Sequence, residues 1–428
     1  MYKANSGDAR GVTTYQEDRV SPYRWVVIGS LTSSVGVALT VMFVIGLLLP
    51  DISEELGLSP SQQGWLGSSV IFGNLIFAIP ANLWLSRYRP WRVASIAFLG
   101  VAFFTLLQAW SPIFAILILG RIGLGISFIA SQAPRAMIIM QWTPRKRMPF
   151  TQGVVFGSID IIMGIAFFAT PILVLWLGSW RDALYVMSGV AFFTAVLWLV
   201  FGKERDTGEY RDRMQAQLQS PLLTIFKYKQ LWIMGLGMAT SMMAQTAFQT
   251  FWPTFAQDGL GASATATGVA LGLMQVVAGP TDFMANALPA LARRQPAVLA
   301  ACGIATALAY FGLLYVDSIP LLYLLSILRG LFFAFFPVLM LMVYQLPDIK
   351  PREVTVGIAF MQTSIWLGAS VGPLLVGFLQ EATGDLRLGL LITAFGPLVL
   401  VVVAVILQAQ KVGIARRLAM SMDTGVEA

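Results

Sequence analysis

Five charged residues interrupt long apolar runs of this 428-residue sequence, and they are the residues best able to do chemistry: Arg121, Arg135, Asp160, Asp282 and Arg329. If these runs cross a bilayer, a charge at mid-depth costs about 2.5–3.5 kcal/mol, so each of the five marks a candidate site. A guanidinium group offers forked donors to carboxylate and phosphate-like oxygens, whereas a buried carboxyl group can carry a proton. The sequence therefore points to anion binding and proton transfer inside a membrane.

Arg121 and Arg329 occupy matching positions in two apolar runs. Each arginine follows a proline by nine residues, Pro112 in one run and Pro320 in the other, which places it about 13 Å into a helix. We predict that the two form a clamp for an anionic solute. The alternative is a structural role, in which each guanidinium donates hydrogen bonds to helix carbonyls or polar side chains.

Arg135 and Asp160 lie at similar distances before and after Lys146, the centre of a short loop between two runs. Antiparallel neighbours would place them at similar depth, so we predict a structural ion pair between two helices. Asp160 is also a candidate proton-coupling residue.

Asp282 has no basic residue in its own run, and Ala78 stands at the equivalent position of the other half. Burial favours the neutral form of a carboxyl group, which suits proton coupling, and Asp282 is our first candidate for that role. A helix-end acid bonded to Thr281 or to nearby arginines is the alternative.

Uncharged polar residues add further candidates for substrate binding. Gln245 and Gln249 are four residues apart and share one helix face, and Asn74 and Gln362 lie deep in other runs. We expect these four amides to line a central cavity. The sequence has no histidine and a single cysteine, Cys302, so we expect no metal site and no cofactor.

The elements that must position these residues are membrane-spanning helices. Hydrophobic residues make up 57% of the chain and charged residues only 11%, roughly half the charged share of a soluble domain. The runs lack the alternation of barrel strands, so they are predicted to be helices. The twelve predicted spans are 25–49, 64–85, 93–110, 113–140, 151–175, 183–201, 230–255, 268–288, 297–316, 320–344, 355–379 and 389–408.

The basic residues orient these spans. Of the 28 lysines and arginines, three lie inside spans, Arg181 and Arg387 lie in loops on one side, and all the others fall on the opposite side. The positive-inside rule then places both termini in the cytoplasm. We expect the chain to lie in the cytoplasmic (inner) membrane of the cell. Because the basic residues lie in loops between apolar helices, we expect no binding of nucleic acid.

The sequence repeats itself with an offset of 204 residues. Leu56-Gly57-Leu58-Ser59 is followed by Gly64, and Leu260-Gly261-Ala262-Ser263 is followed by Gly268. We therefore predict two pseudo-symmetric halves. The predicted domains are a tail at 1–24, a six-helix bundle at 25–201, a cytoplasmic linker at 202–229, a six-helix bundle at 230–408 and a tail at 409–428.

With these halves, the chain resembles the major facilitator superfamily over its whole length. The residues that carry the resemblance are the Arg-x-x-x-Gly from Arg121 to Gly125, the loop from Trp142 to Arg147, and Ser179-Trp180-Arg181. The resemblance implies a cavity lined by spans one, four, seven and ten. The usual Gly-x-x-x-Asp-Arg loop after span two is missing here. The Gly-x-x-x-Gly-Pro that antiporters of the family carry in span five is also missing, although Gly368, Gly372 and Pro373 supply it in span eleven.

The functional hypothesis is a monomeric secondary active transporter, a symporter that moves a small organic or inorganic anion with protons by alternating access. No phosphate-binding Gly-x-x-x-x-Gly-Lys loop is present, and no set of residues suggests an enzyme. Two alternatives stay open, an exporter of amphipathic compounds or drugs, and a membrane sensor that keeps the transporter fold without transporting.

Overall fold

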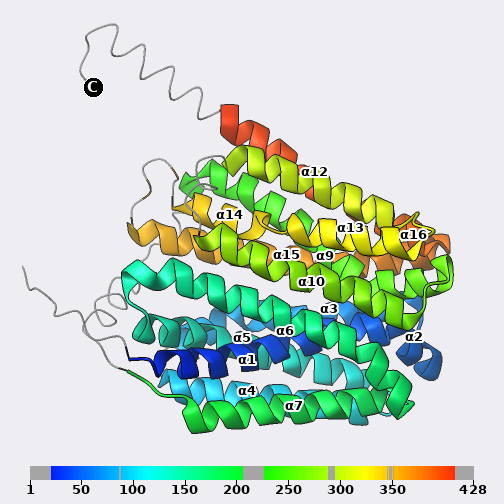
Figure 1. The fold of residues 1–428 in the computed structure, drawn as a ribbon, viewed down its shortest axis with the longest axis horizontal. Helices are drawn as coiled ribbons and strands as arrows, with labels where there is room; N and C mark the ends of the chain where they lie inside the picture. The colour runs from blue at the N-terminus through cyan, green and yellow to red at the C-terminus, as the bar shows by residue number, and fades with distance from the viewer. Residues whose placement is uncertain are drawn as a thin grey trace, which may run out of the picture.

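A computed structural model describes residues 21–85, 88–205, 226–287, 295–344, 346, 349 and 351–409. Within these ranges every regular element is a helix, and the helices form two bundles that lie side by side (Figure 1). The predicted all-α membrane fold is confirmed. Most of each predicted tail and most of the predicted linker lie outside the described residues.

The first bundle is formed by the first half of the chain. Its elements are α1 (Arg24–Phe43), α2 (Ile45–Leu56), α3 (Pro60–Leu85), α4 (Pro90–Trp110), α5 (Phe114–Trp142), the short 3-10 turn η1 (Arg145–Arg147), α6 (Met148–Leu177) and α7 (Trp180–Phe201).

The second bundle follows the same plan. Its elements are α9 (Lys229–Leu260), α10 (Ala264–Ala287), α12 (Gln295–Leu313), α13 (Ile319–Leu331), α14 (Phe335–Val343), α15 (Pro351–Thr383), α16 (Leu386–Ala394) and the 3-10 turn η3 (Gly396–Leu398), after which helix continues to residue 409. Ten stretches of the described residues are long and apolar enough to cross a bilayer. Two further long helices, α3 with 26 residues and α9 with 32, correspond to the second and seventh of the twelve predicted spans.

The internal repeat of the sequence appears as matching geometry in the two bundles. Gly57 ends α2 with φ 61°, and Gly261 ends α9 with φ 66°, a left-handed conformation that glycine adopts without steric cost. Gly64 of α3 packs closely against Pro373 of α15, and its counterpart Gly268 of α10 packs against Pro171 of α6. The repeated glycines therefore end equivalent helices and form equivalent contacts between the bundles.

Three spans are interrupted within their length. The first is interrupted at Val44, between α1 and α2, the tenth at residues 332–334, between α13 and α14, and the twelfth at residues 395–398, after α16. Pro50 lies inside α2, Pro337 follows the second interruption closely, and Pro397 lies in the third. Since proline removes a backbone donor and crowds the preceding turn, it favours such interruptions. The apolar runs gave no sign of any of the three.

The bundles touch mainly along α6 with α10 and along α3 with α15, and α2 also packs against α9. Glycines allow the close approach of α6 to α10, since a Cβ on Gly164 would meet the Gly272 carbonyl at 2.8 Å. At one end of the molecule Glu381 of α15 accepts a hydrogen bond from the Ser61 backbone N–H of α3, at 2.9 Å. This contact ties the first turn of α3 in one bundle to α15 in the other.

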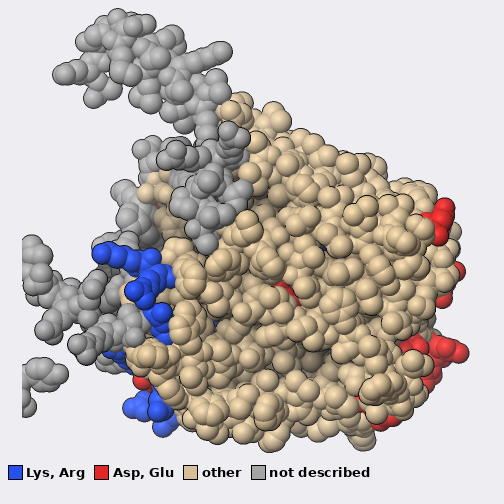
Figure 2. Space-filling view, in the orientation of Figure 1, with Lys and Arg blue, Asp and Glu red and all other residues tan. Residues whose placement is uncertain are grey.

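Exposed charged side chains gather mainly at opposite ends of the molecule, and Figure 2 shows very few on the broad surface between these ends. Exposed basic residues lie at the end that carries η1, for example Lys146, Arg147 and Lys203. The opposite end carries exposed acids, which we call the acidic rim: Asp51, Glu54, Asp258, Glu381 and Asp385. The band between the two ends carries few charged side chains, as expected of a surface that faces lipid.

Candidate transport site

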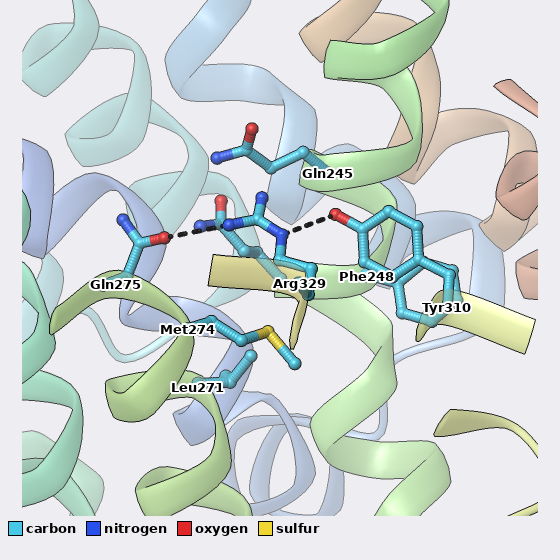
Figure 3. A pocket seen from close by; sticks show the side chains of 8 residues that line it. Gln245, Phe248, Leu271, Met274, Gln275, Tyr310 and Arg329 are labelled. Carbon is cyan, nitrogen blue, oxygen red and sulfur yellow. Dashed lines mark hydrogen bonds between the residues drawn. The ribbon is translucent and has the colours of Figure 1, made fainter. Parts of the chain in front are cut away.

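A small cavity in the second bundle brings Arg329 together with three glutamines (Figure 3). It is lined by Gln245, Phe248, Gln249, Leu271, Met274, Gln275, Tyr310 and Arg329. Its volume of about 10 Å³ is room for about one water molecule, so a larger solute requires the helices to move apart. Four helices of one bundle, α9, α10, α12 and α13, contribute these side chains.

Arg329 is buried and is held by other side chains rather than by the backbone. Its Nε donates to the Tyr310 hydroxyl at 3.2 Å, and one terminal nitrogen donates to Gln275 Oε1 at 3.5 Å (Figure 3). It lies in the last turn of α13, immediately before the break in the span, where the negative end of the helix dipole favours a cation. The Tyr310 ring in turn stacks on Phe248 at 4.1 Å between centroids. Discontinuous helices with a charged group at the break are a common construction of transporter sites.

Arg121 has a different environment, although its place in the sequence matches that of Arg329. Its side chain is 0% exposed and donates to four backbone carbonyls. Those of α1 belong to Val41 and Met42, beside the break in the first span, and those of α3 belong to Leu66 and Gly67. Because a helix break leaves carbonyls without their helical partners, Arg121 acts as a cap on the broken span. The structure does not place it in the cavity.

The two buried acids lie on faces directed at Arg329. Asp160 of α6 and Asp282 of α10 are both within electrostatic range of the Arg329 guanidinium, and of each other. Asp282 shares a helix face with Gln275, two turns away. Because α6 packs against α10, the group of Asp160, Asp282 and Arg329 joins the two bundles.

The expected pairing of Arg135 with Asp160 is not made in this structure. Arg135 lies over the ring of Phe156, 5.5 Å from its centroid, and Asp160 is directed at the second bundle. Among the described residues, ion pairs within 4.0 Å are formed by Arg181 with Glu55 and by Lys227 with Glu353. Sequence spacing gave similar depth for the predicted pair but could not give the direction of either side chain around its helix.

The predicted amides fall in different places. Gln245 and Gln249 line the cavity, whereas Asn74 is buried within the first bundle where α3 packs against α5, and Gln362 is half-buried on α15. Sequence reasoning missed Gln275 and Tyr310, the two side chains that hold Arg329. A signal for Gln275 was available, because it lies on the same predicted helix face as Asp282.

Comparison with known proteins identifies the fold family. A model of the Major Facilitator Superfamily matches residues 30–346 and 234–416. The chain belongs to the Major Facilitator Superfamily. The predicted resemblance is thereby confirmed, and the chain is a multi-pass membrane protein of a transporter family.

Within the Major Facilitator Superfamily, curated relatives carry different solutes. The chain is 25% identical over 380 residues to a probable sulfoacetate transporter of Cupriavidus necator, covering 82% of this chain and 85% of that protein. It is 27% identical over 218 residues to a purine ribonucleoside efflux pump of Salmonella typhimurium, covering 48% of this chain and 52% of the pump. The chain therefore spans about half the length of the pump.

Two solved superfamily structures share the fold. Both are of a bacterial homologue of the human lysosomal transporter Spinster in an inward-facing conformation. The unoccupied form has a TM-score of 0.66 at 17% identity, covering 90% of this chain and 95% of that one. The occupied form has a TM-score of 0.67 at 16% identity, covering 93% and 97%.

Proposed function

We propose that this chain is a secondary active transporter for a small organic or inorganic anion, which binds at Arg329. The observation that carries the proposal is the contrast between the two deep arginines. Arg121 is occupied by four backbone carbonyls, whereas Arg329 has two neutral side-chain partners and borders a cavity. A guanidinium group held by neutral partners in a low-dielectric site favours an incoming anion.

The amides of the cavity give the anion a second set of contacts. Gln245 Oε1 and Gln249 Oε1 are buried and, in the part of the chain that the structure describes, accept no hydrogen bond. Since a buried amide oxygen without a partner costs free energy, a solute with a hydrogen-bond donor would be stabilised there. We therefore expect a compact solute with an anionic head at Arg329 and a donor group toward α9. The relative named as a probable sulfoacetate transporter supports an organic anion.

For transport, the two bundles would move relative to each other and expose the site alternately to each side. We propose that Asp160 and Asp282 couple this movement to protons. They lie near Arg329, and Asp160 belongs to the opposite bundle, so a change in their charge alters the attraction across the interface. A proton bound by either acid would leave more of the Arg329 charge for the anion.

A second candidate is export of a nucleoside, which the relative named as a purine ribonucleoside efflux pump suggests. The stacked pair of Phe248 and Tyr310 at the cavity offers an aromatic surface, and the glutamines offer donors and acceptors to a base. This arrangement gives the Arg329 charge no role, which makes the two candidates separable.

The experiment is solute flux into proteoliposomes with a competition panel of sulfoacetate, small carboxylates, inorganic phosphate, inosine and a hydrophobic cation. We expect anions to compete, and we expect Arg329→Gln to abolish their flux. Arg387→Gln is the matched control, because it also removes one arginine from the second bundle but lies near the acidic rim. Competition by inosine or the hydrophobic cation alone, with flux that survives Arg329→Gln, would overturn the anion proposal.

A further inference from the structure

We infer that Arg135 forms a second anion-binding position, between the Arg329 cavity and the membrane face that carries η1. The inference rests on the proposed function, because it gives the same anion a second binding site along its transport path. The path would run from Arg329 in the second bundle to Arg135 in the first.

The helix register of α5 directs Arg135 toward the second bundle. Phe128, Gln132 and Arg135 follow one another at intervals of four and three residues, so they lie on one face of the helix. Phe128 packs its ring against Trp366 of α15, at 5.7 Å between centroids. Because α15 belongs to the other bundle, this face of α5 borders the space between the bundles.

A second contact places Arg135 in the same space. The Arg135 guanidinium lies over Phe156 of α6, and Phe156 packs against Phe336 of α14 at 6.0 Å. The main neighbours of α5 are α1, α3 and α4, whereas those of α6 are α1, α7 and α10. Arg135 of α5 therefore contacts α6, although neither helix is a main neighbour of the other. The contact lies beside the pair of Phe156 and Phe336, which joins the two bundles.

Depth separates the two arginines along the membrane normal. Arg135 precedes the end of α5 by seven residues, about 10 Å, whereas Arg329 is separated from the end of its span by the interruption at residues 332–334 and by the whole of α14, about 13 Å long. Arg135 is thus closer to the face that carries η1. Phe156 is one turn from Asp160 on α6, so this aromatic pair lies next to the charged group around Arg329.

The contacts of Arg135 leave its charge available. The side chain is half-buried, and its guanidinium lies over the face of the Phe156 ring, a contact that leaves its N–H donors free to bind an anion. Within the described ranges, no carboxylate lies within 4.0 Å of it. An arginine at this depth without a close carboxylate is stabilised by a bound anion. A carboxylate, sulfonate or phosphate-like group that binds the guanidinium of Arg329 can bind that of Arg135 in the same way.

The experiment measures the local charge and needs no knowledge of the solute. Gln132→Cys is made in a Cys302→Ser background, which removes the chain's single cysteine. Gln132 donates only to acceptors of its own helix, Phe128 O and Ser131 Oγ, so its replacement breaks no contact between helices that the structure describes. The probes are an anionic and a cationic methanethiosulfonate reagent of similar size, and the readout is the ratio of their reaction rates.

We expect the anionic reagent to be favoured at position 132, and Arg135→Gln to lower the rate ratio about tenfold, since one unit charge acts with opposite sign on the two reagents at close range. Lys146→Gln, which removes an exposed charge of η1, is the control and should leave the ratio unchanged. A thiol at position 132 that reacts with neither reagent, or a ratio insensitive to Arg135→Gln, would overturn the inference.

Transport then distinguishes failure of this inference from failure of the proposed function. With sulfoacetate as the probe, Arg135→Gln should raise the KM for entry from the η1 face several-fold, leave kcat nearly unchanged, and be rescued by Arg135→Lys. Flux that persists in Arg329→Gln defeats the proposed function, yet the reagent ratio still decides the role of Arg135. Equal KM changes from both faces would argue for a merely structural Arg135.

Discussion

The two deep arginines should respond oppositely to the same substitution, Arg121→Gln and Arg329→Gln. Arg121 donates to Met42 O at 2.9 Å, Leu66 O at 3.1 Å, Val41 O at 3.3 Å and Gly67 O at 3.5 Å. A glutamine amide has two donors, so at least two of these buried carbonyls lose their partner, at about 1–3 kcal/mol each. We expect Arg121→Gln to lower the free energy of unfolding by roughly 2–6 kcal/mol, a large share of the usual 5–15 kcal/mol.

Arg329→Gln should be mild by comparison, because its partners are the Tyr310 hydroxyl and the Gln275 amide, and both can turn toward other partners in the cavity. We expect a loss of about 1–2 kcal/mol. The assay is thermal unfolding in detergent, followed by fluorescence-detected size exclusion, alongside flux in proteoliposomes. Arg121→Gln should lower Tm by about 5–15 °C, against less than about 4 °C for Arg329→Gln.

The flux measurement provides the opposite ranking, since Arg329→Gln should lose anion transport while it remains folded. Any Arg121→Gln protein recovered in folded form should retain transport. A stable but inactive Arg121→Gln, together with an unstable but active Arg329→Gln, would refute the assignment of Arg121 to helix capping and of Arg329 to the solute.

Two further pairs of substitutions test proton coupling and the close packing of the two bundles at Gly46. Asp282→Asn should remove the dependence of anion flux on a pH gradient, and Asp160→Asn should reduce it less, because an amide cannot release a proton. Flux measurements after a pH jump check this. An unchanged pH dependence in both variants would exclude the two acids as proton-coupling residues. Gly46→Ala should hold the bundles apart at the acidic rim, because its Cβ would overlap the Gln249 carbonyl oxygen of the opposite bundle, whereas Gly368→Ala, which overlaps a carbonyl within one bundle, should only lower stability. Thiol accessibility of a cysteine placed in the cavity separates these two effects, and equal accessibility in both glycine variants would show that the contact of Gly46 with α9 does not hold the bundles together.

Much of the fold follows from physical constraints that are visible in the sequence. A bilayer requires backbone groups to be satisfied within each span, so apolar runs of about 20 residues become helices, and the helices found lie close to the twelve predicted spans. Gly57 and Gly261 follow the first and seventh predicted spans in the sequence repeat, and both adopt positive φ at helix ends. The interruptions at Val44, after Leu331 and after Ala394 escaped prediction, because hydropathy does not register a local loss of helical hydrogen bonds.

The candidate site was less predictable, because sequence gives the depth of a side chain but not its partners. Arg121 and Arg329 have the same spacing from a proline, yet their environments diverge at the breaks. The first span is interrupted, and the backbone carbonyls at its interruption accept hydrogen bonds from Arg121. The equivalent span of the second half, α9, is a continuous helix, so it has no such carbonyls to bind Arg329. In the second half the break falls instead in the span that carries Arg329 itself. The pseudo-symmetry of the sequence is thus lost at the level of backbone breaks.

The acidic rim bears on how fast an anion could travel in each direction. On the orientation predicted from the basic loops, the rim faces the outside, so an anion that approaches from there meets like charges such as Asp51 and Glu381. Such repulsion slows arrival and hastens departure, and it weakens beyond about 10 Å at 0.1 M salt. The rate of anion uptake should therefore increase as salt is added, while the rate of anion release to the outside should change little. The rim can change only the rates of arrival and departure, and the solute gradient at which net movement stops is still set by the coupled ions.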